Sequence, residues 1–191
     1  AFDYITAYQK VASIRTNAND YLTLRMKAKS PRYIKIKWSD MLTYQKYFVS
    51  NDKYYEFTSP IVISNTDNNL DFQGIETITE IESFAHLKPS ALHLSGMESL
   101  TNIDSHDSEF LREVTLESNK MLQTINLSGC ENLGLNQSDE PTGNLNLINC
   151  SNLKHLDVSG TSLGSLNIID IDTENPDAST AIGTGSLEYF D

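Results

Sequence analysis

Cysteine, proline and long apolar runs are scarce in this sequence. Its 191 residues include two cysteines and five prolines. Two cysteines are too few to staple a small secreted domain, and the spacing of Cys130 and Cys150 matches no zinc motif. No stretch approaches the roughly 20 apolar residues of a membrane-spanning helix, so we expect no membrane insertion. The first ten residues lack the charged and apolar regions of a signal peptide.

Motifs of catalysis are also missing. The sequence has no phosphate-binding loop, dinucleotide fingerprint, zinc-protease motif or nucleophile elbow. His106 stands between Asp104 and Asp107, but no distinctive nucleophile accompanies it, which favours a surface turn over a proton-transfer pair. The acidic run from Asp170 to Asp177 alternates carboxylates as a calcium loop does, yet it lacks the required Gly and final Glu. We therefore predict a protein that is not an enzyme and that needs no cofactor and no metal.

Charge is distributed unevenly along the chain. Residues 1–60 contain ten Lys and Arg and five acids, whereas residues 61–191 contain four bases and twenty-one acids. Such a step is typical of two modules with different partners. We predict a basic N-terminal module over residues 1–69 and an acidic domain over residues 70–191. The acidic domain would repel nucleic acid and would suit a basic or neutral protein surface, or a glycan.

The N-terminal module shows the alternation of apolar and polar residues that is typical of β-strands. Residues 22–29 and 34–38 alternate on either side of Ser30 and Pro31, which predicts a β-hairpin with one buried and one basic face. Further strand-like runs at 44–49, 54–58 and 61–64 favour a small β-sandwich. The basic face is a candidate docking surface, and its residues are Lys27, Lys29, Lys35 and Lys37.

Three interpretations of that basic face are open at this point. Tyr21, Tyr33 and Trp38 are interleaved with the cations, as in nucleic-acid-binding proteins. The face could instead be solvated, with lysines that block edge-to-edge strand pairing. It could also contact an acidic neighbour in a larger assembly. We expect no nucleic acid as a partner.

A repeat governs the C-terminal part. Apolar residues that begin each unit stand at positions 92, 103, 114, 125, 145, 156 and 166, so most spacings are close to eleven. A fixed period sustained over this length is the signature of a solenoid. One unit buries three or four side chains, at roughly 1.5–3 kcal/mol each, while ordering its backbone costs about 1–2 kcal/mol per residue. No unit is stable alone, and each must stack on its neighbours.

The segments MLQTINLSGCENLG and NLKHLDVSGTSLGSLNI resemble the leucine-rich repeat family in its bacterial internalin-like form, whose consensus is LxxLxLxx(N/C)xxL. The resemblance covers residues ~84–191 and implies a scaffold that binds proteins or ligands on exposed sheet faces. The chain departs from the family because Met, Cys and Thr replace Asn in places and because the half-repeat is prominent. We therefore expect a mainly β protein, a sandwich-like N-terminal module followed by a flattened β-solenoid, with about 22 residues per turn in 11-residue halves.

This geometry assigns the strands to two faces. The spacing of 20 marks one irregular half-repeat with an acidic loop at residues 137–143. We expect strands beginning at Ile103, Ile125, Leu145 and Leu166 on one face, and strands beginning at Leu92, Val114 and Leu156 on the other. Cys130 and Cys150 would then stack one turn apart in the interior, as reduced thiols or, alternatively, as a disulfide. Because side chains alternate along a strand, the first face would carry an outward polar stripe. Its candidate binding residues are Asn102, Asp104, Thr124, Asn126, Asn144, Asn146, Ser165 and Asn167.

These features predict a non-enzymatic recognition scaffold, as a bacterial surface adhesin or a phage tail or virion component. The alternatives are a structural subunit that docks through its N-terminal module, and a non-catalytic part of a larger hydrolase. We expect an extracellular, cell-surface or virion location. Residues 186–191, SLEYFD, align with NLKHLD at 152–157, which predicts one more strand and a solenoid that continues beyond residue 191. A merely solvated stripe is the competing interpretation of the polar residues.

Overall fold

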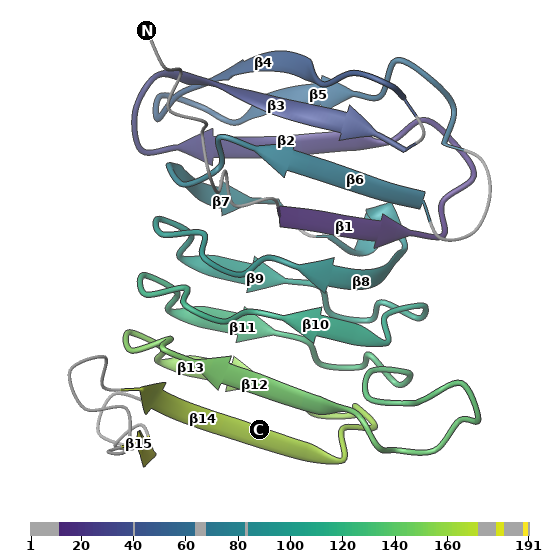
Figure 1. Cartoon of the computed structure of the whole chain (residues 1–191), viewed down its shortest axis with the longest axis vertical. Helices are drawn as coiled ribbons and strands as arrows, with labels where there is room; N and C mark the ends of the chain where they lie inside the picture. Colours follow the sequence, from purple (N-terminus) through teal and green to yellow (C-terminus); the bar gives the residue numbers. More distant parts are fainter. Residues whose placement is uncertain are drawn as a thin grey trace, which may run out of the picture.

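The protein is built from β-sheets arranged in two facing layers (Figure 1). The computed structural model describes residues 12–39, 41–63, 68–82, 84–171, 179–181 and 189–190. Sheet 1 has the strand order β10-β8-β1-β6-β3-β4, and sheet 2 has the order β16-β13-β11-β9-β7-β2-β5. A third sheet, β12-β14-β15, lies below sheet 1. The predicted mainly β fold with a solenoid is confirmed, and about four turns of solenoid occupy residues 80–169.

The N-terminal strands form the upper part of this stack. Sheet 1 receives β1 (Ala12–Thr16), β3 (Arg32–Trp38), β4 (Gln45–Val49) and β6 (Asn68–Gln73). Sheet 2 receives β2 (Thr23–Ala28), β5 (Tyr55–Thr58) and β7 (Ile78–Ile81). Inward side chains from both sheets meet in a core around Trp38, whose indole N–H donates to the Tyr47 hydroxyl at 2.8 Å. The sandwich-like arrangement predicted from the alternation is therefore present.

The predicted hairpin across Ser30 and Pro31 is wrong. β2 pairs with β5 and β7, whereas β3 pairs with β4 and β6, so the two strands lie in opposite sheets. Both strands have one buried face, as predicted. Alternation reveals a buried face but does not reveal which sheet receives the strand, and here the turn crosses from one sheet to the other.

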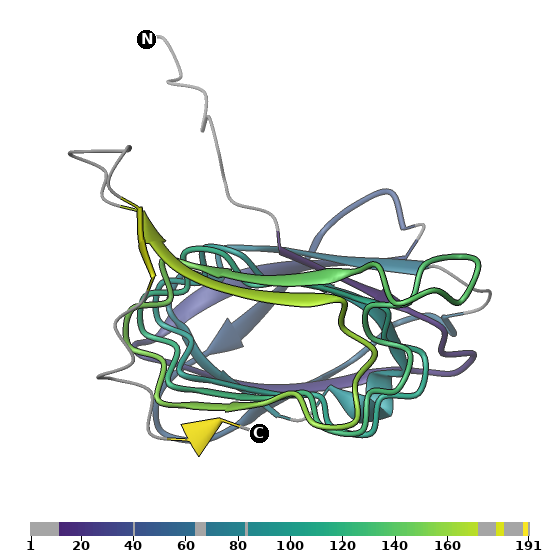
Figure 2. The same ribbon diagram turned by 90° about the horizontal axis from the view of Figure 1, so that it is seen from below.

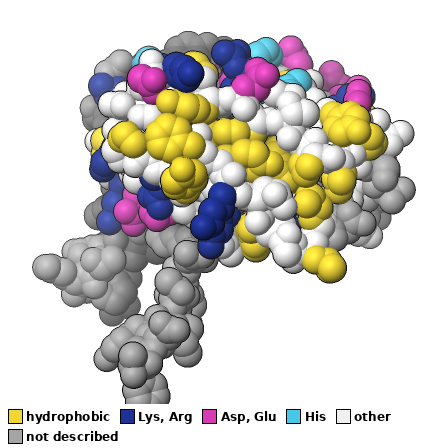
Figure 3. All heavy atoms as spheres, turned by 90° about the horizontal axis from the view of Figure 1, so that it is seen from above, with side chains coloured by type: hydrophobic (Ala, Val, Ile, Leu, Met, Phe, Trp, Pro, Cys, Tyr) yellow, Lys and Arg dark blue, Asp and Glu magenta, His cyan; other side chains and the backbone are white. Residues whose placement is uncertain are grey.

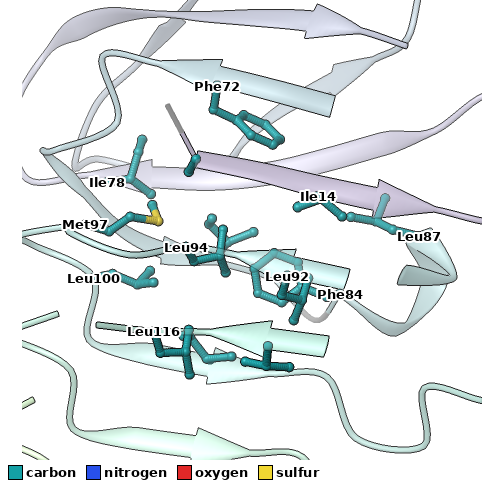
Figure 4. Packing of buried hydrophobic residues seen from close by; sticks show 14 of the residues in the cluster. Ile14, Phe72, Ile78, Phe84, Leu87, Leu92, Leu94, Met97, Leu100 and Leu116 are labelled. Atoms are coloured by element: carbon teal, nitrogen blue, oxygen red, sulfur yellow. The ribbon is translucent and has the colours of Figure 1, made fainter. Parts of the chain in front are cut away.

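The predicted boundary after residue 69 falls inside β6. Antiparallel β1 pairs with β6 on one side and with β8 (Pro89–His93) on the other, so sheet 1 crosses the boundary without a break. Figure 4 shows Phe72 and Ile14 of the upper part packed above Leu92 and Leu116 of the solenoid. One hydrophobic core therefore joins the two segments, and the upper sandwich acts as a cap on the solenoid.

Solenoid turns stack in parallel with a regular register. Ala91 of β8 pairs with Glu113 of β10 (Glu113–Thr115), and Asn102 of β9 (Asn102–Asp104) pairs with Thr124 of β11 (Thr124–Asn126). Both pairs join residues 22 positions apart. A short 3-10 helix, η1 (Ala85–Leu87), leads into β8. Viewed along the stack, successive turns superimpose as a flattened ring (Figure 2). Buried hydrophobic side chains form the core between the two layers. The predicted turn length is confirmed.

The predicted assignment of strands to faces is wrong after residue 125. β11 pairs with β13 (His155–Asp157), with Ile125 opposite Leu156, so Leu156 lies on the face of Ile103 and Ile125. β12 (Asn144–Ile148) pairs instead with β14 (Ser165–Ile171) on the other face, where the Ser118 N–H also donates to the Ile148 carbonyl at 2.7 Å. The spacing of 20 is one long half-turn that contains an inserted loop.

The loop inserted between β11 and β12 is held against the stack by hydrogen bonds from backbone and side chain. The Gly143 N–H donates to the Gly134 carbonyl at 2.7 Å, and the Arg112 guanidinium bonds the Asn136 carbonyl at 2.8 Å and the Asp139 carboxylate at 3.0 Å. Leu135 and Pro141 form an isolated bridge across the loop. The insertion is therefore an ordered part of the solenoid edge.

Cys130 and Cys150 are buried free cysteines, as in the first of the two predictions, but they do not stack on each other. Cys130 follows a strand of sheet 2, and its thiol lies 3.1 Å from the Ser105 carbonyl one turn above. Cys150 follows β12 at the opposite corner, 3.1 Å from the Leu116 carbonyl. The inserted loop places the two cysteines on opposite edges of the coil.

Two short strands complete the sheets. β15 (Ser179–Ala181) pairs with β14, and β16 (Tyr189–Phe190) pairs with β13. Phe190 stands opposite Leu156, which is the register that the alignment of SLEYFD with NLKHLD predicts. Most of the acidic run from Asp170 to Asp177 lies outside the described residues.

Candidate binding surfaces

The outer face of sheet 2 carries an in-register ladder of polar side chains. Thr124 stands between Asn102 and His155, and Asn126 stands between Asp104 and Asp157. The residues between them, Ile103, Ile125 and Leu156, point inward and are buried. Neighbouring strands of a sheet are about 4.8 Å apart, so the two columns repeat at that interval. Four of the predicted binding residues lie together here: Asn102, Asp104, Thr124 and Asn126.

One column of this ladder is fixed by hydrogen bonds to the turn that follows each strand. The Asn126 Oδ1 accepts from the Ser128 N–H at 3.1 Å and from its hydroxyl at 2.7 Å. The Asp157 Oδ1 accepts the same two bonds from Ser159, at 3.0 and 2.7 Å. Side chains that accept from a backbone N–H two residues later close an Asx turn. These oxygens are therefore rigidly placed.

At the top of that column the same position forms an ion pair. The Asp104 carboxylate lies 2.5 Å from the His106 Nδ1. The hydrogen bond and the charge of Asp104 raise the pKa of His106 above its usual value of 6.5. Both side chains are partly exposed, so solvent screens the pair. The proximity that the sequence suggested is confirmed in a surface turn.

Two residues of the other column, Asn102 and Thr124, are open to a ligand. The side chains of Asn102 and Thr124 form no hydrogen bond with any part of the chain that the structure describes, and both are half-buried in the sheet face. The Asn126 amide nitrogen is likewise without a bond there, since its contacts all use Oδ1. Together they offer a hydroxyl, two amide nitrogens and an amide oxygen to a partner from a rigid surface.

The remaining predicted stripe residues lie on the opposite face, because β12 and β14 stand below sheet 1. There the Asn167 amide nitrogen donates to the Asn146 Oδ1 at 2.8 Å, and the Ser165 hydroxyl donates to the Asn144 Oδ1 at 2.6 Å. These side chains satisfy part of their hydrogen-bonding capacity along their own ladder. The single stripe expected from sequence is therefore two separate surfaces.

The predicted docking lysines are also divided between the two sheets. Lys27 lies on β2 in sheet 2 at 4.0 Å from Glu80, and Lys37 lies on β3 in sheet 1 at 3.1 Å from Asp71. Lys29 follows β2 and lines a groove of about 460 Å³. Lys35 stands directly opposite Lys46 on β4. The four predicted lysines therefore do not lie together on one face, because the turn after β2 crosses between sheets.

Much of the positive charge on sheet 2 is already paired. The Arg25 guanidinium lies 2.7 Å from Glu82 and 3.8 Å from Glu56, and it also lies over the Tyr54 ring, 5.4 Å from the centroid. The Tyr54 hydroxyl donates to Glu80, and this bond, with burial and the nearby carboxylates, raises the pKa of Tyr54 to about 12. This cluster stabilises the cap internally.

The groove beside Lys29 lies on the side of the molecule where the chain passes from strands of sheet 1 to strands of sheet 2. Turns from three levels line it, and the residues are Lys29, Glu76, Thr77, Thr79, Glu98, Ser99, Thr101 and Met121. Charges of both signs share it, and Met121 is 45% exposed.

Within the described residues, no three His, Cys, Asp or Glu side chains lie close enough together to hold a metal ion. No described helix is long and apolar enough to cross a membrane.

Sequence reasoning missed an aromatic surface at the top of the cap. Tyr33 on β3 is 65% exposed and Phe48 on β4 is 41% exposed, and the two residues are register partners. Figure 3, viewed from above, shows hydrophobic side chains gathered across this end of the molecule with Lys and Arg among them. The sequence did contain a signal for this surface: both aromatic residues occupy outward positions in strands whose inward positions are apolar.

Comparisons with known proteins give no relative from which a function could be transferred. No family model, no curated protein and no solved structure matches the chain. The functional argument therefore rests on the surfaces themselves.

Proposed function

We propose that the chain is a non-enzymatic recognition scaffold that binds a partner protein through the outer face of sheet 2. The observation that carries the proposal is the open column of Asn102 and Thr124 beside the fixed column of Asp104, Asn126 and Asp157. The fixed side chains lose little entropy on binding, and the open side chains offer hydrogen-bonding groups to a partner, so the face favours specific recognition. The resemblance of the repeat to leucine-rich repeats supports the same proposal.

Charge defines the kind of partner. The face includes the carboxylates of Asp104 and Asp157, and residues 61–191 as a whole are strongly acidic. Like charges across an interface suppress binding, whereas complementary charges speed association. A partner with a neutral or basic surface and exposed hydrogen-bonding groups suits this face. A bacterial cell surface or a phage tail or virion would be a natural setting for such a scaffold.

Arrays of immobilised proteins and glycans, probed with the labelled chain, test the proposal. Thr124→Arg places a bulky cation in the centre of the sheet 2 face, and Ser165→Arg is the matched control on the opposite face. We expect protein ligands whose signal is lost with Thr124→Arg and retained with Ser165→Arg. Equal profiles for the two variants, or signals confined to glycans, would contradict the proposal.

A second candidate function, a structural subunit that docks through its cap, is favoured by Lys35 and Lys46, which stand opposite each other and have no ion pair with the described residues. Size-exclusion chromatography of mixtures with acidic partner proteins at low and high salt tests it. Complexes that form only at low salt would support electrostatic docking. Elution of the chain alone at both salt concentrations would contradict it.

A further inference from the structure

The free edge of sheet 1 combines an unpaired backbone with unpaired charge. β4 is the last strand of that sheet, so within the described residues one of its edges has no strand beside it. An edge strand presents backbone N–H and C=O groups that can pair with another chain. β4 contains no proline, and its sequence, QKYFV, favours a strand. The edge is therefore competent to accept a further strand.

Two lysines beside this edge stand opposite each other. Lys35 and Lys46 are register partners on β3 and β4. Neither has an ion pair with the described residues, and neither β3 nor β4 contains an acidic residue. Like charges directly opposite each other in a sheet are destabilising. A carboxylate supplied from outside would relieve that repulsion.

Four other cations of the cap differ in this respect. Arg25, Arg32 and Lys37 each lie within 3.2 Å of a carboxylate oxygen of the same chain. Lys27 also has a carboxylate partner, Glu80, at 4.0 Å. Arg15, Lys29 and Lys53 also have no ion pair with the described residues, but Lys35 and Lys46 stand directly opposite each other, so the need for negative charge is concentrated there.

An apolar platform adjoins the two lysines on the same outward face. The Tyr33 and Phe48 rings pack edge to face with centroids 5.7 Å apart, and Phe48 also packs against Tyr55 at 5.5 Å. Lys53 lies over the Tyr55 ring, 5.1 Å from its centroid. Large aromatic side chains that remain exposed beside a charge typically mark a binding surface. We name the set Tyr33, Lys35, Lys46 and Phe48 the aromatic–lysine strip.

We infer that the aromatic–lysine strip and the β4 edge bind an extended acidic polypeptide segment, which adds to sheet 1 as a strand beside β4. In strand addition, main-chain bonds supply affinity and alternate side chains supply specificity. The segment places a carboxylate beside Lys46 and, two residues away on the same face, an apolar or aromatic side chain against Phe48. This surface lies on sheet 1, so the inference is independent of the function proposed for sheet 2.

Two observations favour a polypeptide over nucleic acid. The free backbone edge can pair with another peptide backbone, and a sugar-phosphate chain offers no matching ladder. The whole chain carries a formal charge of −12, which repels a polyanion of the charge density of nucleic acid. An edge lysine also discourages pairing with strands that lack an acid, so the same residue that protects the edge selects the partner.

Fluorescence anisotropy with a labelled nine-residue peptide, Glu-Thr-Phe-Thr-Glu-Thr-Phe-Thr-Glu, tests the inference. The full chain should bind it, and binding should weaken as salt is raised. Lys35→Glu combined with Lys46→Glu should weaken binding at least tenfold. Lys88→Glu combined with Lys120→Glu alters the net charge equally on the solenoid and should leave binding within twofold. Circular dichroism establishes that both variants are folded.

Several results would overturn the inference. They are failure of the wild-type chain to bind the peptide, equal weakening by both pairs of substitutions, and tighter binding of a ten-nucleotide oligo-dT than of the peptide. Self-association of the wild-type chain in sedimentation that the Lys35 and Lys46 substitutions abolish would assign the edge to a second copy instead. The test of sheet 2 is separate: loss of its protein ligands with Thr124→Arg would support that function whichever of these results is observed.

Discussion

The side-chain carbonyl of Asn119 accepts a hydrogen bond from the backbone N–H of Met97, one turn above it, at 2.8 Å. The amide nitrogen of Asn119 donates to the Leu116 carbonyl at 3.1 Å, and the side chain is fully buried. One residue thus satisfies polar backbone groups of two successive turns at the corner of the coil. Unpaired groups of this kind are costly when buried.

Replacing Asn119 should therefore destabilise the solenoid. Asn119→Ala leaves the Met97 N–H and the Leu116 carbonyl without this partner, at a cost of about 2–3 kcal/mol in the free energy of unfolding. Urea denaturation followed by circular dichroism measures the change. Asn102→Ala, on the exposed face, is the control and should shift stability by no more than about 0.5 kcal/mol. Equal effects of the two substitutions would refute the structural role of Asn119.

Gly134 should tolerate a side chain less well than Gly160. Both have positive φ, 95° and 67°, but a Cβ at Gly134 would lie 2.6 Å from the Ser162 carbonyl oxygen, whereas at Gly160 the nearest atoms are 3.5 Å away. Gly160→Ala should cost about 1 kcal/mol, from the backbone conformation alone. Gly134→Ala should cost at least about 2 kcal/mol more, because backbone must move. Thermal denaturation of both variants measures the difference, and equal melting temperatures would show that the inserted loop is not packed as described.

Both cysteine thiols should resist modification in the folded protein. Burial raises the pKa of the Cys130 thiol, and thiolate is the reactive form. We expect a thiol reagent such as Ellman's reagent to react slowly at neutral pH, and to titrate two thiols once urea unfolds the chain. Fewer than two thiols after unfolding without a reductant would indicate a disulfide and would contradict the separation of the two cysteines.

His106 should titrate above pH 6.5. The hydrogen bond that His106 donates to the Asp104 carboxylate raises the pKa of His106 in the folded chain above that in the unfolded chain. The pair therefore stabilises the fold fully below about pH 6.5, and this contribution is lost as pH rises through the folded pKa. NMR titration of the imidazole should show the raised value and a lower value in Asp104→Asn. An identical pKa in the two proteins would rule out the pair.

The repeat made most of the solenoid predictable, because buried Leu, Ile and Val residues recur in every half-turn. The 22-residue register and the alternation at Ile103 and Ile125 follow directly from that pattern. The residues with positive φ at the corners of the coil were also marked in the sequence. Gly96 and Gly129 occupy the position at which Ser118 and Asn149 also have positive φ.

The candidate surfaces were less predictable because they depend on which of the two faces of the solenoid each strand joins. An inserted loop between Ile125 and Leu145 exchanges the faces of all later strands, and spacing alone does not distinguish a long half-turn from a short whole turn. Leu156 consequently pairs 31 positions after Ile125. The same ambiguity affected Ser30 and Pro31, where a turn between alternating strands can close a hairpin or cross between sheets.

The central claim is the assignment of strands to the two faces, since it decides which residues form one surface. An engineered disulfide tests it most directly. Asn126 and Asp157 are register partners on adjacent parallel strands, about 4.8 Å apart and within the range that a disulfide spans. Asn126→Cys with Asp157→Cys should therefore cross-link on oxidation, while Asn126→Cys with Asn146→Cys should remain reduced. A cross-link between positions 126 and 146, with none between 126 and 157, would contradict the account.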